Sequence, residues 1–172
     1  SNSLIKNSTI INNHASGEGG GALFLSHNAH ISIVNSICWS NSPQEIWFDP
    51  NLGSDPSMLS INYTNIQNSI ATNNNGTITW GTGNVDVDPM FVDTANGDYH
   101  LLASSQLING GHPDSLDSDG TIADIGAYPY LNSYSGPTWY ITEGGNDTTA
   151  TGASDDPFRS IQSGINFSSD AD

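Results

Sequence analysis

Short apolar runs separated by polar turn residues fill the first eighty positions of the chain. The runs are ALFLS (22–26), HISIVNSICW (30–39), EIWFD (45–49), MLSINYTNI (58–66) and TITW (77–80). They are rich in β-branched and aromatic residues, and Gly, Asn, Ser and Pro separate them, as is usual at strand boundaries. The pattern predicts a series of short β-strands.

The strands repeat with a fixed spacing. Residues 4–13 (LIKNSTIINN) align with residues 32–41 (SIVNSICWSN) at a constant offset of 28 positions, and residues 61–69 (INYTNIQNS) give a weaker third copy. Self-similarity at a fixed period is typical of a solenoid. The alignment places Cys38 opposite Ile10, so we expect both side chains to point inward, where a free cysteine behaves as a small hydrophobic residue.

Asparagine recurs at equivalent positions of the repeat, with Asn7 opposite Asn35 and Asn13 opposite Asn41. In stacked parallel strands such side chains can hydrogen-bond to one another. Asparagine also tolerates the left-handed conformation that tight corners need. The alternative is that an Asn-rich chain aligns Asn with Asn by chance.

Two longer phrases in this region, NSTIINNHASGEGGGALFL (7–25) and VNSICWSN (34–41), carry a family resemblance. They resemble the right-handed parallel β-helix repeats of secreted bacterial surface proteins. The resemblance implies an all-β fold, a right-handed parallel β-helix, with a short capping helix near the C-terminus.

Residues 83–130 resemble the closing segment of β-helix proteins that carry a choice-of-anchor Q domain. The matching motifs are GNVDVDPMF (83–91), DYHL (98–101) and DSDG followed by DIGAY (117–128). The chain departs from the pattern at SSQLINGG (104–111), where Gln106 replaces a proline that the family usually has. The resemblance identifies a family and implies no activity.

The last part of the chain is similar to the N-terminal cap segment of the same family. TWYIT (138–142) reads as a strand, Asp155 or Asp156 as a helix N-cap, and Pro157 as part of the first helical turn. Phe158, Ile161 and Ile165 recur at helical spacing. In the family such a helix covers the open first rung, which would otherwise expose unpaired strand edges.

The predicted order is therefore β-helix rungs at 1–82 with an open start, a closing segment at 83–130, a linker at 131–137, and a strand plus cap helix at 138–172. A seven-residue linker reaches at most about 25 Å, so folding the cap back over its own first rung would be strained. Two explanations are open. The chain is a window of a longer tandem β-helix protein, or the tail covers the open rung of another copy in a head-to-tail filament.

The net charge of the chain limits the kinds of molecule that it can bind. The chain has 18 acidic and two basic residues, for a net charge of -16. Phosphate binding requires Lys and Arg, so nucleic acids and anionic membranes are excluded, and no apolar run approaches the ~20 residues of a membrane span. The charge is compatible with cation binding and a salty exterior, and we expect an extracellular or cell-surface location.

Two groups of aspartates are candidate calcium ligands. Asp86 and Asp88 alternate along one predicted strand, and Asp117, Asp119 and Asp124 lie in the Gly-containing loop DSDGTIAD. Calcium prefers several oxygen ligands from a short loop. The alternative is an exposed polar strand face at the first site and, at the second, a loop whose carboxylates cap backbone amides.

Three classes of function remain. A polysaccharide lyase would need a base, for which only Lys6 and Arg159 are at hand. A glycoside hydrolase would need paired carboxylates, such as Asp86 with Asp88, or Glu18. A carbohydrate-binding module could use the four tryptophans. The leading prediction is a non-catalytic structural or adhesive segment without catalytic residues, whose partners are other copies of itself or adjacent β-helix domains.

Overall fold

The computed structural model describes residues 2–17, 19–50, 56–67 and 76–168. The residues outside these ranges belong to two of the predicted segments. In the first segment (1–82) they are Ser1, Glu18, 51–55 and 68–75, and in the last segment (138–172) they are 169–172. Within those ranges the chain is mostly β, with parallel sheets and one short helix. It divides into two compact units, which we call the N-terminal unit (1–87 with 125–127) and the C-terminal unit (88–124 with 128–172).

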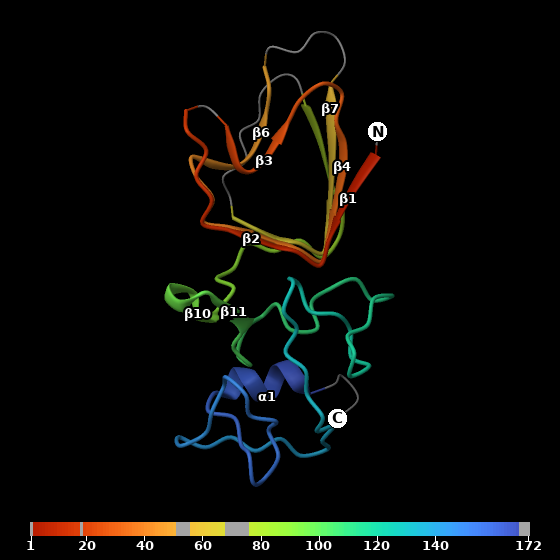
Figure 1. The fold of residues 1–172 in the computed structure, drawn as a ribbon. Coiled ribbons are helices and arrows are strands. Elements are labelled where there is room, and N and C mark those ends of the chain that lie inside the picture. The colour runs from red at the N-terminus through yellow and green to blue at the C-terminus, as the bar shows by residue number, and fades with distance from the viewer. Residues whose placement is uncertain (1, 18, 51–55, 68–75, 169–172) are drawn as a thin grey trace. The chain divides into compact units, whose positions relative to one another are not determined.

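Three parallel sheets build the N-terminal unit (Figure 1). The first contains, in spatial order, β1 (Asn2–Lys6), β4 (His30–Val34), β7 (Ser57–Asn62) and β9 (Gly76–Trp80). The second contains β2 (Thr9–Ile11), β5 (Ile37–Trp39) and β8 (Asn65–Ile66). The third contains β3 (Gly20–Leu25) and β6 (Gln44–Phe48). The long predicted runs at 30–39 and 58–66 are each split into two strands.

The register among β1, β4 and β7 and among β2, β5 and β8 confirms the 28-residue repeat. The β3–β6 and β7–β9 pairs have shorter offsets. Ile33 pairs with Ile5 on one side and Ile61 on the other, and Cys38 pairs with Ile10. The pairing therefore extends to the third copy, which looked weak in the sequence. Equivalent residues are neighbours in space, as the repeat predicts.

Left-handed corners separate the strands at repeated positions. Asn7, Asn35 and Tyr63 follow β1, β4 and β7 with φ values of 48°, 48° and 46°. Asn12 and Ser40 follow β2 and β5 with φ values of 54° and 55°. This confirms the corner role predicted for asparagine, and it shows that Tyr and Ser occupy the same strained conformation at equivalent sites.

The inward-facing side chains of the three sheets form one apolar core. Cys38 and Ile33 are fully buried within it, and each of the three sheets contributes buried residues to it. Burial raises the pKa of the Cys38 thiol to about 12, and the nearby Glu45 adds to this effect. The thiol therefore stays protonated, which agrees with the predicted packing role.

Polar side chains are also built into this unit. Asn13 donates to the Asn41 Oδ1 atom through both its backbone N–H and its side-chain amide, each at 2.9 Å. The Asn41 amide in turn donates to the Ile10 carbonyl at 2.8 Å and to the Glu45 carboxylate at 2.6 Å. The predicted contact between equivalent asparagines is confirmed, and it continues to a fully buried carboxylate.

The C-terminal unit combines an antiparallel hairpin with a loop-rich segment and a helix. The hairpin pairs β10 (Phe91–Asp93) with β11 (Asp98–Leu101) through the 3-10 turn η1 (Thr94–Asn96). Helix α1 (Ile161–Phe167) comes from the tail. It is the only helix longer than one turn in the described ranges, and it is too short to cross a membrane.

The predicted helix start is wrong. Ser160, not Asp155 or Asp156, is the N-cap, and its side chain accepts from the Ser163 N–H. Phe158 pairs with Ile141 in a parallel β-bridge and is fully buried, so the chain is still extended at Pro157. Burial of a large aromatic side chain outweighs the local capping preference.

Ser40 allows the cost of a left-handed corner to be measured without a change in packing, because its side chain is exposed. We expect Ser40→Asn, which copies the residue at the equivalent position 12, to raise the free energy of unfolding by up to about 1 kcal/mol. Ser40→Val should lower it by about 1 kcal/mol or more, because β-branched residues are disfavoured at positive φ. Urea unfolding checks both, and equal stability of the two variants would contradict the prediction.

Candidate functional site

The acidic loop at 117–124 is held by hydrogen bonds to backbone amides. The Asp117 carboxylate accepts from the Asp124 N–H at 2.8 Å. Asp119 accepts from the Thr121 N–H and hydroxyl through one oxygen and from the Asn132 N–H through the other. These are the capping contacts that the alternative to a calcium loop predicts.

Asp124 is the most buried carboxylate of this loop, with only 4% of its surface exposed. Its two oxygens accept from the Asn109 N–H at 2.8 Å and the Tyr130 N–H at 2.7 Å. Burial raises the pKa of Asp124 to about 7, and the negative charges of Asp117 and Asp119 add to this, whereas the two amide hydrogen bonds oppose it. Asp124 thus connects the turn at Asn109 to the turn at Tyr130, although burial disfavours its charged form.

The two aspartates of the first predicted group fall in different units. Asp86 is exposed and belongs to the N-terminal unit, while Asp88 belongs to the C-terminal unit and caps the Met90 N–H at 2.9 Å. No cluster of three or more His, Cys, Asp or Glu side chains suited to a metal ion occurs in the described ranges. Calcium binding by any of these residues stays a prediction.

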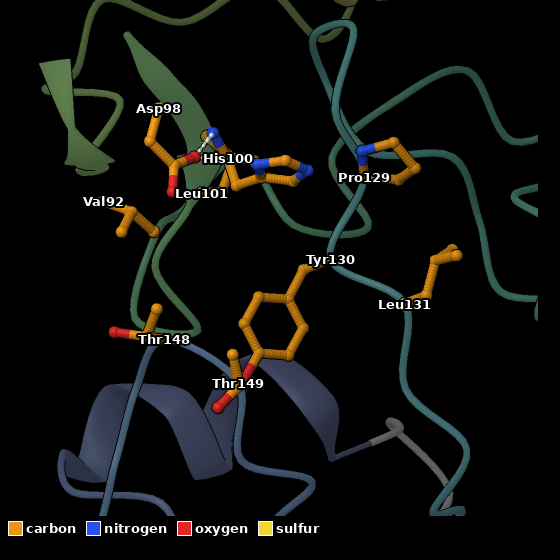
Figure 2. Close-up of a pocket in the computed structure, with 9 residues that line it drawn as sticks. All are labelled: Val92, Asp98, His100, Leu101, Pro129, Tyr130, Leu131, Thr148 and Thr149. Carbon is orange, nitrogen blue, oxygen red and sulfur yellow. Dashed lines mark hydrogen bonds and ion pairs between the residues drawn. The ribbon is translucent and has the colours of Figure 1, made fainter. Parts of the chain in front are cut away.

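A pocket of about 320 Å³ opens elsewhere in the C-terminal unit (Figure 2). It lies where three segments meet: the β10–β11 hairpin, residues 129–131, and the tail loop at 148–149. The hairpin contributes Val92, Asp98, His100 and Leu101 to its lining. Sequence analysis did not identify this pocket, because its lining residues come from separate segments between Val92 and Thr149.

Asp98 and His100 form a hydrogen-bonded pair at the pocket. The His100 Nδ1 atom lies 2.7 Å from the Asp98 Oδ1 atom, which also accepts from the His100 N–H at 3.1 Å. The hydrogen bond from the His100 side chain lowers the pKa of Asp98, so Asp98 is ionised near neutral pH. The His100 ring also contacts the Tyr128 ring, with 5.1 Å between centroids.

The tail (138–172) forms another wall because it is anchored at several points on residues 103–105 and on Tyr130. The Ala103 N–H donates to the Asp147 carbonyl, and the Asn166 amide donates to the carbonyls of Ala103 and Ser105 at 2.9 and 2.7 Å. The Tyr130 hydroxyl donates to the Ala150 carbonyl at 2.6 Å. These contacts place Thr148 and Thr149 beside the hairpin.

Asp147 fixes the path of the tail on either side of this wall. One of its carboxylate oxygens accepts from the N–H groups of Arg159 and Ser160 and from the Ser163 hydroxyl at 2.7 Å. Partial burial acts to raise the pKa of Asp147, but these hydrogen bonds outweigh it, so the pKa is lowered. The carboxylate therefore holds the start of α1 against the loop that carries Thr148.

Other residues considered for function are not among those that line this pocket. Lys6 is at the end of β1 in the N-terminal unit, and Arg159 precedes α1. Among the tryptophans, Trp80 is 52% exposed, while Trp139 packs against Phe158 and Tyr134.

Comparisons of the chain with models of known families, with curated proteins and with solved structures found no match.

The raised pKa of Asp124 predicts a pH dependence of stability. The ordinary value is 3.8 and the folded value is about 7, so the folded state holds this proton more tightly. The stabilising contribution is therefore fully present below about pH 4 and is lost as the pH rises through about 7. Asp124→Asn removes this titration. The difference in free energy of unfolding between the variant and the wild type should therefore change by a few kcal/mol in favour of the variant as the pH rises from 4 to 8.

The measurement is chemical unfolding of both proteins across this range, with carboxyl ¹³C NMR to titrate Asp124 directly. Asp114→Asn is the matched control, because the Asp114 side chain is 92% exposed and should show little pH-dependent difference. An Asp124 carboxyl that titrates below pH 4 would contradict the prediction.

Proposed function

We propose that this chain is a non-catalytic, extracellular structural segment built on a right-handed parallel β-helix, and that copies of it associate head to tail. Three observations support the fold: parallel pairing at a 28-residue offset, strand groups that share one core, and left-handed corners at equivalent positions. Parallel strands joined by crossovers are right-handed in nearly all proteins.

The observation that carries the functional proposal is the partial exposure of apolar side chains in the first repeat of the described residues. β1, β2 and β3 each stand at the end of their sheet in the described chain. Ile5 and Ile10 are only partly buried there, whereas their neighbours Ile33 and Cys38 are fully buried. An apolar edge of this kind is a template for added chain.

The tail offers a surface that suits this edge. Ile161 and Ile165 on α1 are 71% and 58% exposed, and Ile141, whose side chain lies next to Gly164 of the same helix, is 39% exposed. Phe158 turns inward instead, so the tail keeps its own core while presenting an apolar face. We propose that this face covers the first strands of a second copy, as the resemblance to a cap segment suggests.

Such a contact joins two different surfaces, so it does not close on itself and extends into a filament. Each copy carries a net charge of -16. Repulsion between copies therefore opposes assembly at low ionic strength, and salt should promote it by screening. The acidic, Asn-rich composition supports a location outside the cell, where such salt is present.

Blocking the two surfaces separately tests the proposal. Leu4 on β1 is 64% exposed, and Leu4→Lys places a charge on the open edge. Ile161→Lys with Ile165→Lys blocks the tail. We expect each variant to weaken self-association at least about tenfold in sedimentation velocity, about 1.4 kcal/mol. An equimolar mixture should form dimers that do not grow, since one edge and one tail remain intact.

Leu116→Lys is the matched control, because Leu116 has the same 64% exposure and lies in the C-terminal unit. It should assemble like the wild type. A wild-type chain that remains monomeric at all concentrations and salt levels would refute head-to-tail assembly, and the β-helix would then act within one polypeptide.

Calcium at the acidic loop is a separate proposal. Asp117 uses one carboxylate oxygen for a hydrogen bond to the Asp124 N–H, and the remaining lone pairs of the three aspartates are the candidate ligands. We expect calcium chloride to raise the melting temperature of the wild type and chelator to reverse this, with no effect in Asp117→Asn. Equal melting temperatures with calcium and with chelator would refute it.

A further inference from the structure

We propose that the pocket between the hairpin and the tail loop binds one ring of a neutral sugar. The proposal rests on the pocket's chemistry and does not depend on head-to-tail assembly. Its volume of about 320 Å³ is at the lower end of the range of small-molecule pockets, about 300–1,000 Å³. A single ring with a few attached hydroxyls matches that size.

The polar groups of the pocket are mainly hydrogen-bond acceptors and hydroxyls. The Asp98 Oδ1 atom is engaged by His100, and its Oδ2 atom makes no hydrogen bond in the described chain. In the tautomer with the proton on Nδ1, which donates to Asp98, the Nε2 atom of His100 is an acceptor. These atoms require a ligand that donates hydrogen bonds, as sugar hydroxyls do.

The tail loop adds groups that can both donate and accept. The Thr148 hydroxyl has no hydrogen-bond partner among the described residues, and its backbone N–H is held by the Asn146 side chain at 2.7 Å. The Thr149 hydroxyl accepts from the same Asn146 side chain at 3.0 Å, which leaves its own proton to donate. The loop is thus positioned by Asn146 with hydroxyls still available.

The remaining walls are apolar, as the CH face of a sugar ring requires. Leu131, which is 52% exposed, and Tyr130 come from the segment that runs to the right of the hairpin in Figure 2. The Tyr130 hydroxyl is engaged by the Ala150 carbonyl, so its ring is fixed in orientation. Alternating acceptors and apolar walls fit an amphipathic ring better than a fully polar or fully apolar ligand.

The charge of the residues that line the pocket favours neutral sugars over anionic ones. No Lys or Arg lines the pocket, and the ionised Asp98 repels carboxylates and phosphates. Anionic sugars such as uronates are therefore disfavoured. An organic cation is the main competitor, but a single carboxylate that is already bonded to His100 attracts it weakly.

The test is ¹H–¹⁵N NMR titration of the full chain with methyl glucopyranoside and methyl galactopyranoside, with glucuronate and tetramethylammonium as charged probes. We expect at least one neutral glycoside to shift the amide signals of Asp98, His100 and Thr148, and glucuronate to leave them unchanged. The proposal is overturned if neither glycoside shifts these signals, or if tetramethylammonium alone does.

Variants separate binding from folding. Thr148→Val removes one free hydroxyl at nearly constant volume and should weaken glycoside binding about threefold to tenfold. Thr142→Val, an exposed threonine away from the pocket, should bind like the wild type. His100→Phe keeps a ring against Tyr128 but removes both nitrogens, and it should weaken binding by a similar factor. Wild-type affinity in both Thr148→Val and His100→Phe would refute the assignment.

Discussion

The left-handed corners are the constraint on which the N-terminal unit depends. After β1, β4 and β7 the chain must turn sharply from the first sheet into the second, and it does so at Asn7, Asn35 and Tyr63 with nearly identical φ values. An extra or missing residue at one corner would move every inward side chain of the next strand to the outer face. The corners therefore hold Ile5, Ile33 and Ile61 in line, and the apolar core follows from that alignment.

Buried polar groups make the same register more specific. The Asn41 amide bonds to the Ile10 carbonyl in one repeat and to Glu45 in its own. Burial raises the pKa of Glu45, while hydrogen bonds from Asn41 act to lower it. A slipped register would separate Asn41 from Asn13 and leave buried polar groups without these partners, which is costly in a low-dielectric interior.

Much of the N-terminal unit could be predicted from the sequence, because its order is local and repeated. The 28-residue offset predicted the pairing of β1 with β4, β4 with β7, β2 with β5 and β5 with β8, but not the β3–β6 and β7–β9 pairs. Strand boundaries fell within a few residues of the apolar runs. The runs at 30–39 and 58–66 were not divided into two strands each, although Asn35 was a candidate corner, since apolar residues continue on both sides of each bend. Periodicity alone does not show a change of direction when the flanking residues are all compatible with strands.

The C-terminal unit was harder to predict because long-range contacts determine it. The loop at 117–124 was recognised as a turn, and Gly120 adopts the positive φ of 91° that its role requires. Its partners Asn109, Tyr130 and Asn132 were not foreseeable, since backbone amides leave no signature in side-chain identity. For the same reason the helix start was misplaced: only tertiary packing shows that Phe158 is extended and buried.

The tail (138–172) packs on the C-terminal unit through one side and exposes apolar side chains on the other. Its inner side is fixed by Phe158, by Asp147 and by the amide of Asn166, and this docking creates the wall that carries Thr148. Its outer side keeps Ile161 and Ile165 exposed. Because the inner contacts are satisfied within the C-terminal unit, the outer face can be covered without dismantling the pocket. A partner on the isoleucines and a ligand beside His100 would therefore be compatible, and each would stabilise the docked tail on which both depend.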